Sequence, residues 1–341
     1  MTPAIKQNYS LKELNTFHID VKAKYFIEIG DLVQLKEFVK NGLSQFQSFF
    51  ILGGGSNLLF INDFDGIVIY PKIKGIDLIN EDNNDVYIKA MCGENWDEFV
   101  EYCVNRGYGG IENLSNIPGN VGATPIQNIG AYGVEAKDVI EKVKTIDVYT
   151  GKEVEFSNVD CKFGYRNSIF KNKLKGKYIV TEVIFKLSKR PKLVTTYGKV
   201  EEELKKLGER NVSNLRKAII KIRDEKLPDH NIIGNAGSFF KNPEISIDQY
   251  NEFKKRFSNC PSYPLNNKKV KIPAAWLIQK GGWKGKREGD VGVYPKQPLV
   301  LVNYWNATGK QIFDLSERIK NSVYNKFGIK LEREVTIVNS Y

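Results

Sequence analysis

The sequence predicts an α+β fold, with a larger part before about residue 225 and a smaller module after it. Three observations lead to this prediction. Helix-like and strand-like patterns are mixed along the chain without repeats or long linkers, two uncharged glycine-rich segments interrupt the first part, and the character of the chain changes after Pro191. With 341 residues, the chain is long enough for two or three domains with substantial cores.

Hydrophobic spacing and end signals predict the individual elements. An acidic cap opens the first helix, Gly107 closes the second, and Gly328 ends the last. The expected helices cover residues 31–40, 94–105, 212–226 and 308–327. The expected strands cover residues 25–29, 49–52, 66–70, 143–149 and 178–187, with a β-rich end at 329–338.

The stretch from Leu114 to Val134 carries no charged residue, although 27% of the whole chain is charged. Its glycines and prolines forbid a long uninterrupted helix, and its amide side chains are polar groups that hydrocarbon does not tolerate, so it is not a membrane span. A tightly turning, uncharged backbone is suited to wrapping a large molecule with main-chain N–H and C=O groups. We therefore expect this stretch, called the cradle below, to hold a cofactor.

A second glycine segment, Gly53-Gly54-Gly55-Ser56-Asn57, directly follows the predicted strand at 49–52. Consecutive glycines after a strand can form a nest of N–H donors for a phosphate or pyrophosphate, although many such segments are plain turns. The segment has neither the Gly-x-Gly-x-x-Gly pattern of a Rossmann site nor the Gly-Lys-Ser/Thr ending of a phosphate loop. A dinucleotide bound here would require a different fold.

Composition excludes several function classes. A net charge of +11 suggests nucleic acid as a candidate binding partner. The lysines, however, lie in short clusters among 40 acidic residues, a distribution that favours anionic small molecules as ligands. Four scattered cysteines without Cys-x-x-Cys spacing indicate reduced, buried thiols, and two histidines leave no expected metal site. No window resembles a membrane span or a signal peptide, so we expect a cytoplasmic protein without membrane or nucleic-acid partners.

Two segments carry residues suited to catalysis. In residues 235–243, Gly237 leaves the hydroxyl of Ser238 clear of crowding side chains, and Lys226, Lys241 and Asn242 are suited to phosphates or a uracil. A plain β-turn into a strand explains the same pattern equally well. A Ser–His–Asp triad is disfavoured because the sequence lacks the Gly-x-Ser-x-Gly elbow.

Arg166 lies among aromatic residues in 163–170, where a guanidinium can hold a carboxylate by two bonds or simply stack on a surface tyrosine. Near the end, residues 331–335 alternate as on a strand, so that Glu332 and Glu334 share one face and Arg333 takes the other. Such a face is usually solvated. A glutamate that turns into a cleft would instead be a candidate acid or orienting group.

Together the segments resemble the UDP-N-acetylenolpyruvoylglucosamine reductase (MurB) family. The resemblance rests on residues 52–57, 117–133, 163–170, 196–198, 226–229, 235–243 and 331–335, in the family's order and over nearly the full length. It implies a two-part FAD-binding region of the vanillyl-alcohol-oxidase (PCMH) type, here 1–72 and 73–225. A smaller α+β substrate-binding domain at 226–328 follows, and a strand at 329–341 returns near the active site. Thr196-Tyr197-Gly198 implies the subgroup whose tyrosine loop closes over substrate.

The resemblance also implies a reaction and a set of site residues. The reaction is NADPH-dependent, FAD-mediated reduction of UDP-N-acetylglucosamine enolpyruvate to UDP-N-acetylmuramate for peptidoglycan, in a monomer. In it, Arg166 and Glu334 stabilise the developing negative charge, with Glu334 protonated or sharing a proton, and Ser238 donates the proton. Noncovalent FAD is expected because Gly53 to Asn57 includes no His or Cys. The implied FAD-binding residues are Gly53, Gly54, Gly55, Ser56, Asn57, Ile117, Pro118, Gly119, Gly122, Ala123, Thr124, Ile126, Gly130 and Val180. The implied substrate-binding residues are Tyr165, Tyr197, Lys226, Asn242 and Gln297.

Gly54 departs from the family pattern, and we expect no effect if only backbone N–H groups are used there. Three other functions remain as alternatives: a flavin oxidase of the same superfamily, a nucleotide-sugar-binding protein without turnover, and a nucleic-acid-binding protein. The sequence does not distinguish NADPH from NADH, nor whether NADPH and the UDP-sugar share one pocket.

Overall fold

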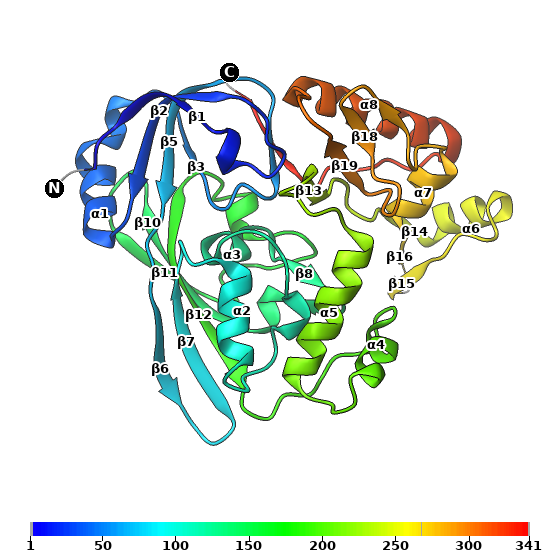
Figure 1. The fold of residues 1–341 in the computed structure, drawn as a ribbon, viewed down its shortest axis with the longest axis horizontal. Coiled ribbons are helices and arrows are strands. Elements are labelled where there is room, and N and C mark those ends of the chain that lie inside the picture. The colour runs from blue at the N-terminus through cyan, green and yellow to red at the C-terminus, as the bar shows by residue number, and fades with distance from the viewer. Residues whose placement is uncertain (1–2, 267, 340–341) are drawn as a thin grey trace. The chain divides into compact units, whose positions relative to one another are not determined.

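The structure, a computed structural model, describes residues 3–266 and 268–339, which form two compact units (Figure 1). The first unit contains Ala23–Gly55, Asp65–Glu225 and the start of the chain up to Tyr9. The second contains Ser10–Lys22, Ser56–Phe64 and the chain from Lys226 onward. Both units mix helices with strands, which confirms the predicted α+β class.

A five-stranded antiparallel sheet is the main layer of the first unit, in the order β11-β10-β12-β7-β6. Helix α2 (Trp96–Val104) packs on this sheet through a core in which the rings of Trp96, Phe99 and Phe185 lie 4.8 to 5.8 Å apart. The helix begins where Asn95 Oδ1 accepts hydrogen bonds from two backbone N–H groups. The strands are β6 (Ile76–Glu81), β7 (Asp85–Met91), β10 (Ile140–Asp147), β11 (Glu153–Ser157) and β12 (Tyr178–Ser188).

A second sheet of the first unit has the order β1-β2-β5-β3, with β3 and β5 parallel. Helix α1 (Leu32–Asn41) begins at Asp31, whose carboxylate accepts a hydrogen bond from Gln34 N, as the predicted acidic cap requires. Leu35 and Phe38 of this helix share one core with β2, β5 and the strands β10 and β12. The strands are β1 (Lys6–Ser10), β2 (Lys22–Ile29), β3 (Phe49–Ile51) and β5 (Phe64–Pro71).

Helices α4 (Val200–Lys206) and α5 (Val212–Lys226) complete the first unit around a small separate core. Glu203 of α4 accepts hydrogen bonds from Lys206 at 2.6 Å and from Lys221 of α5 at 2.7 Å. These bonds, first from Lys206 and then from Lys221, lower the pKa of Glu203 to about 2. Glu203 therefore stays ionised and joins the two helices at any pH near neutrality.

The second unit contains two antiparallel sheets, β13-β19-β18-β17 and β14-β16-β15, and the parallel pair β20–β4. Its longest helix, α8 (Gly309–Phe327), begins with a capping box at Thr308 and ends at Gly328 in the left-handed conformation. A Cβ on Gly309 would lie 1.7 Å from Phe60 O, so only glycine allows α8 to pack this closely on β4. The other helices are α6 (Ile247–Arg256) and α7 (Ala274–Lys280). The strands are β4 (Leu58–Phe60), β13 (Gly234–Ser238), β14 (Glu244–Ser246), β15 (Tyr263–Asn266), β16 (Lys269–Lys271), β17 (Arg287–Glu288), β18 (Val291–Val293), β19 (Val300–Asn303) and β20 (Thr336–Val338).

The predicted helices are confirmed to within two residues at either end, and most predicted strands are present. The predicted strand at residues 331–335 is wrong, because there the backbone forms only an isolated bridge between Arg333 and Phe240 before β20 begins. Strands β13 to β19 were not predicted, because each of them is only two to five residues long. Strand β20 lies within the predicted β-rich end at 329–338.

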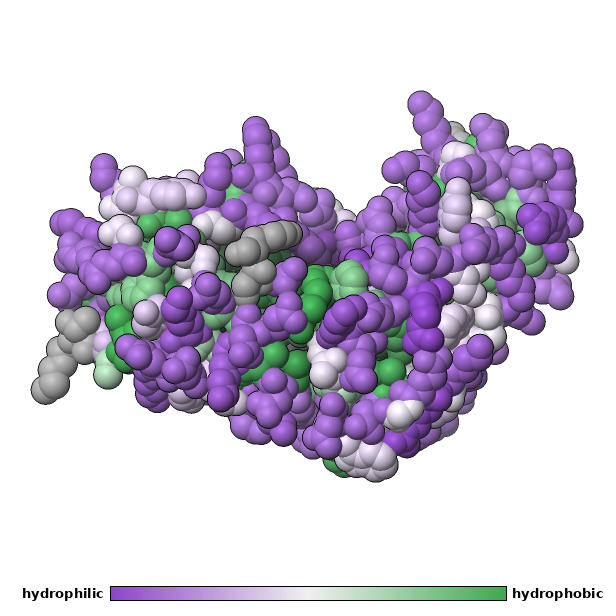
Figure 2. All heavy atoms as spheres, turned by 90° about the horizontal axis from the view of Figure 1, so that it is seen from above, coloured by the Kyte–Doolittle hydropathy of each residue, from purple (hydrophilic) through white to green (hydrophobic). Residues whose placement is uncertain are grey.

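The surface and the cysteines complete the description. No helix within the described part of the chain is long and apolar enough to cross a membrane, and the face drawn in Figure 2 is mostly hydrophilic. Cys92, Cys103, Cys161 and Cys260 are buried and free, as predicted. Burial raises the pKa of the Cys92 thiol to about 12, so this side chain is an unreactive part of the core.

Candidate active site

The cradle folds as a series of short turns. It contains a 3-10 turn at Val121–Ala123, the single-turn helix α3 (Thr124–Gln127) and the two-residue strands β8 (Gly130–Ala131) and β9 (Val134–Glu135). Three backbone hydrogen bonds fix it to the connection between β7 and α2: Trp96 N to Gly119 O, Val121 N to Glu94 O, and Gly122 N to Cys92 O. The cradle is therefore a tightly turning backbone held against the large sheet.

The glycine loop at residues 53–55 packs directly against the cradle. A Cβ on Gly54 would lie 2.6 Å from the Cα of Gly119 and 2.9 Å from Oδ1 of Asn120. On Gly53, by contrast, it would meet only the Cβ of Ala123, at an ordinary 3.6 Å. Glycine at position 54 is thus what lets the two backbones touch, a steric role that the sequence did not reveal.

Backbone donors are concentrated where the loop meets the cradle. The half-buried N–H groups of Gly53, Gly54, Gly119 and Asn120 have no hydrogen-bond acceptor among residues 3–266 and 268–339. Donors in such positions cost free energy unless a ligand or water accepts from them. Several such N–H groups on two backbones in contact suit the diphosphate of a dinucleotide.

The other predicted cofactor residues lie in several places. Most belong to the cradle: Ile117, Pro118, Gly119, Gly122, Ala123, Thr124, Ile126 and Gly130. Thr124 is buried and its hydroxyl donates to Val121 O at 2.8 Å, so this side chain stabilises the cradle from inside. Val180 is buried on β12, opposite Thr145. Ser56 and Asn57 belong to the second unit, where Asn57 O accepts from Thr336 N.

Arg166 lies in a tight turn of the first unit with a φ of +51°, a left-handed conformation that arginine rarely adopts. Its Nη2 donates to the carbonyl oxygen of Gly130 in the cradle, and its guanidinium lies 5.3 Å from the ring centroid of Tyr165. The turn is tied to the cradle again by Ser168, whose hydroxyl donates to Ile126 O at 2.5 Å. Strained residues of this kind persist where the surroundings hold them, and they concentrate at functional sites.

Ser238 ends β13 in the second unit, beside an irregularity in the pairing of β13 with β19. Gly237 before it has a φ of +66°, and a Cβ there would have no neighbour within 4 Å. The following Phe239 and Phe240 are fully buried with their rings edge to face at 5.3 Å. The half-buried serine thus stands between an open side and an apolar core, as predicted.

Glu334 is half-buried and lies next to the segment that follows Ser238. Its N–H donates to Phe239 O at 2.9 Å, and Lys241 N donates to Glu332 O. The preceding Glu332 is exposed and pairs with the Lys241 ammonium at 3.6 Å. The structure therefore brings Glu334 and Ser238 to neighbouring backbone positions within the second unit, whereas Arg166 belongs to the first.

The predicted substrate residues are spread over both units. Tyr197 is 53% exposed in the loop before α4, and Lys226 is the exposed last residue of α5. In the second unit, the Asn242 side-chain oxygen accepts a hydrogen bond from Ala274 N at the start of α7. Gln297 is buried next to β19, with its side-chain oxygen 3.5 Å from Leu299 N. Asn242 and Gln297 are thus held in place by the backbone around them.

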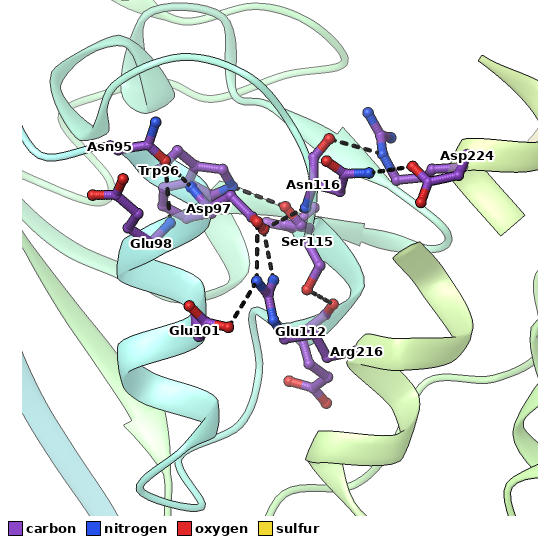
Figure 3. A network of polar contacts seen from close by, with 12 residues as sticks. Asn95, Trp96, Asp97, Glu98, Glu101, Glu112, Ser115, Asn116, Arg216 and Asp224 are labelled. Atoms are coloured by element: carbon purple, nitrogen blue, oxygen red, sulfur yellow. Dashed lines mark hydrogen bonds and ion pairs between the residues drawn. The ribbon is translucent and has the colours of Figure 1, made fainter. Parts of the chain in front are cut away.

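A polar network fixes the start of the cradle (Figure 3). Arg216 of α5 forms two hydrogen bonds with the Asp97 carboxylate, at 2.6 and 2.9 Å, and Asp97 also accepts from Asn116 N at 2.5 Å. Burial acts to raise the pKa of Asp97, but Arg216 and the Asn116 N–H more than offset it, so the pKa lies below its ordinary value. Asn116 adopts a φ of +57° and also contacts Asp224 and Arg223.

A second supporting segment was missed by the sequence analysis. Thr16 exchanges two bonds with Asn235 of β13: its hydroxyl donates to Asn235 O at 2.6 Å, and its carbonyl accepts from Asn235 N. A Cβ on Gly234 would lie 2.4 Å from Phe17 O. Residues near the start of the chain therefore form the back of the Ser238 strand. Their long separation from β13 in sequence left no local signal.

Known proteins resemble the chain over its whole length. A family model described as an FAD binding domain matches residues 23–157, and one described as the UDP-N-acetylenolpyruvoylglucosamine reductase C-terminal domain matches residues 228–338. The UDP-N-acetylenolpyruvoylglucosamine reductase of Flavobacterium johnsoniae is 45% identical, over 98% of this chain and 99% of that protein. The same enzyme of Bacteroides fragilis is 42% identical, over 98% and 100%.

A solved structure shows the same fold. The crystal structure of the Thermus caldophilus UDP-N-acetylenolpyruvylglucosamine reductase aligns with a TM-score of 0.69 and 22% identity, over 99% of both chains. The fold, the two packed glycine segments and the matched FAD-binding region define a flavoprotein of the PCMH type with a reductase C-terminal domain. The chain belongs to the UDP-N-acetylenolpyruvoylglucosamine reductase family.

The close approach at Gly54 generates a prediction. A Gly54→Ala substitution should weaken FAD binding by about tenfold or more, because a methyl group forces the loop away from Gly119 at a typical cost of about 1–3 kcal/mol. The dissociation constant of FAD, measured by fluorescence titration of the apoprotein, checks this. Gly30→Ala is the matched control, because a Cβ there would have no neighbour within 4 Å. Equal FAD affinity of the two variants would contradict the role of this contact.

Proposed function

We infer that the chain is an FAD-dependent oxidoreductase that uses NADPH to reduce UDP-N-acetyl-3-O-(1-carboxyvinyl)-glucosamine to UDP-N-acetylmuramate, a precursor of peptidoglycan. Membership of the reductase family at 45% identity over nearly the full length supports the reaction. The structural observation that carries it is the pairing of the segment bearing Glu334 with Phe239, next to Ser238. In this pairing the proposed proton donor, Ser238, and a second acidic side chain, Glu334, lie on neighbouring segments next to the buried Phe239 and Phe240.

The residues present fit FAD. The partnerless N–H groups of Gly53, Gly54, Gly119 and Asn120 lie on two backbones in contact, as diphosphate binding requires. When bound there, FAD would supply the hydride-transfer chemistry between NADPH and the terminal carbon of the enolpyruvyl double bond. The cradle would hold the cofactor by main-chain groups, and Asp97 and Arg216 would keep the start of the cradle in place.

The side chains act on the substrate. Hydride addition leaves negative charge on the neighbouring carbon and its carboxylate, and catalysis requires that this charge be stabilised where it develops. Arg166 and Glu334 fill this role in our proposal. Ser238 then donates a proton to the carbon that bears the carboxylate, which a weakly acidic hydroxyl can do because that carbon is strongly basic. The buried Phe239 and Phe240 would exclude water behind the serine.

The finer assignments are part of the proposal. Tyr165, Tyr197, Lys226, Asn242 and Gln297 hold the UDP-sugar, and Tyr197 places the chain in the subgroup with the tyrosine loop. Residues 1–72 and 73–225 form the two parts of the FAD-binding region, and 226–328 the substrate-binding domain. The protein acts as a cytoplasmic monomer.

NADPH oxidation followed at 340 nm, with and without UDP-N-acetylglucosamine enolpyruvate, tests the function. Oxidation that depends on the UDP-sugar supports the reductase. Oxygen consumption with a sugar or alcohol and no response to the UDP-sugar would indicate a flavin oxidase instead.

FAD should be bound noncovalently, because the Gly53 to Asn57 segment contains no His or Cys that could form a flavin link. Acid precipitation of purified protein should release all of the flavin into the supernatant. Yellow colour that stays in the pellet would disprove this.

Loss of the Ser238 hydroxyl should affect one half-reaction. Ser238→Ala should be reduced by NADPH at the normal rate, but its reaction with the UDP-sugar should slow by about 10²- to 10⁴-fold, the usual contribution of a general acid. Ser238→Cys should recover part of the rate, since a thiol is the stronger acid. Stopped-flow absorbance separates the two half-reactions. Equal slowing of both would mean that Ser238 has only a structural role.

Arg166→Lys should retain FAD nearly normally and lose much of its turnover, because an ammonium cannot reproduce the two-point grip of a guanidinium. Steady-state kinetics, with the flavin content measured on the same sample, checks this. An unchanged turnover number would remove Arg166 from the mechanism.

A further inference from the structure

The far end of the cradle lies under the Tyr197 loop. The ring of Tyr197 meets the ring of Tyr132 edge to face, with centroids 6.0 Å apart and an interplanar angle of 87°. A Cβ on Gly133 would lie 3.2 Å from Val194 Cγ1 and 3.9 Å from the Cβ of Tyr197. The segment expected to hold the cofactor thus also supports the loop expected to hold the substrate.

A buried amide ties the loop to the cradle. Asn113 is 1% exposed, and its side-chain nitrogen donates to Tyr132 O at 2.9 Å and to Val194 O at 2.8 Å. Both hydrogens of one amide group are therefore used, one on each segment. Tyr132 has a φ of +49°, a strained conformation for an aromatic residue, which such contacts maintain.

Arg223 of α5 joins the two ends of the cradle. Its Nε donates to Asn116 O at 3.1 Å, and its charge interacts with the Tyr132 hydroxyl and with Asp97 and Asp224. Burial raises the pKa of Tyr132, and the charge of Arg223 acts in the opposite direction. The guanidinium is thus placed to orient the tyrosine on which Tyr197 rests.

We propose that Tyr132, oriented by Arg223, is the seat on which the Tyr197 loop closes, so that both are positioning residues for the UDP-sugar. The inference rests on the proposed function, because only there is Tyr197 assigned to that ligand. Neither residue needs to touch the ligand. A change at Tyr132 or Arg223 lowers the fraction of molecules in which the Tyr197 loop contacts Tyr132. The apparent affinity for the UDP-sugar then falls by the same factor.

Titration of the holoenzyme with UDP by isothermal calorimetry tests the proposal. Arg223→Gln keeps a donor of similar reach but loses the charge, and Tyr132→Leu removes the ring. Both should weaken UDP binding about tenfold, as expected if the seated population falls to about a tenth. Tyr132→Phe keeps the ring and should weaken binding less. Arg106→Gln is the matched control, because Arg106 stacks on the ring of Tyr102 at 3.6 Å and donates to Tyr102 O, and neither residue belongs to the loop or the cradle.

Combining variants separates a seat from a general loss of stability. If Arg223 acts through the loop, adding Arg223→Gln to Tyr197→Ala should cause no further loss of affinity. Additive losses of UDP affinity in the double variant would overturn the role of the seat but leave the assignment of Tyr197 to the substrate intact. The same holds if Arg223→Gln and Tyr132→Leu both bind UDP normally while Tyr197→Ala binds it more weakly. Unchanged UDP affinity in Tyr197→Ala would overturn the substrate assignment and the seat together.

Discussion

The paired contact between Asp97 and Arg216 is the interaction on which the cofactor side of this molecule depends. It joins α2 to α5, and the same carboxylate accepts the N–H of Asn116, where the cradle begins. Arg216 is 8% exposed, so losing Asp97 would leave a buried charge with only the Glu101 carboxylate, at 3.8 Å, as ion-pair partner among the described residues, which is destabilising. The pair thereby fixes the backbone at Asn116, shortly before Gly119 and Asn120 of the cradle.

The sequence was informative where a structural feature is local. Asp31 caps its helix and Gly328 ends the last helix, as expected. The glycines and prolines of the cradle give the tightly turning backbone that they indicated. The features that the sequence did not predict depend on contacts between residues far apart in the chain. Arg216 carries no local sign that it will meet Asp97, and nothing near Thr16 in sequence indicates that it will support β13. Pairings of this kind are decided by tertiary packing, which hydrophobic periodicity does not encode.

Gly54 and residues 331–335 show two limits of reading the sequence alone. The neighbour of Gly54 in space is the backbone of Gly119, so the space available there decides which residue fits. The alternation of Glu332 with Arg333 is real: the first is exposed, and the second is half-buried near Ser316. It nevertheless predicted a strand where only one bridge forms, because alternation specifies side-chain direction and does not guarantee a hydrogen-bonded partner.

The parallel pairing of β20 with β4 has a consequence for biosynthesis. Strand β4 leaves the ribosome early, but its partner is made only after all of the intervening chain, and Thr336 then bonds Asn57 beside Glu334. Contacts that span so much sequence form late and slowly. A nascent chain can complete the region that matches an FAD binding domain, residues 23–157, well before it can assemble the part that carries Ser238. Cofactor capture can therefore precede catalytic competence during translation.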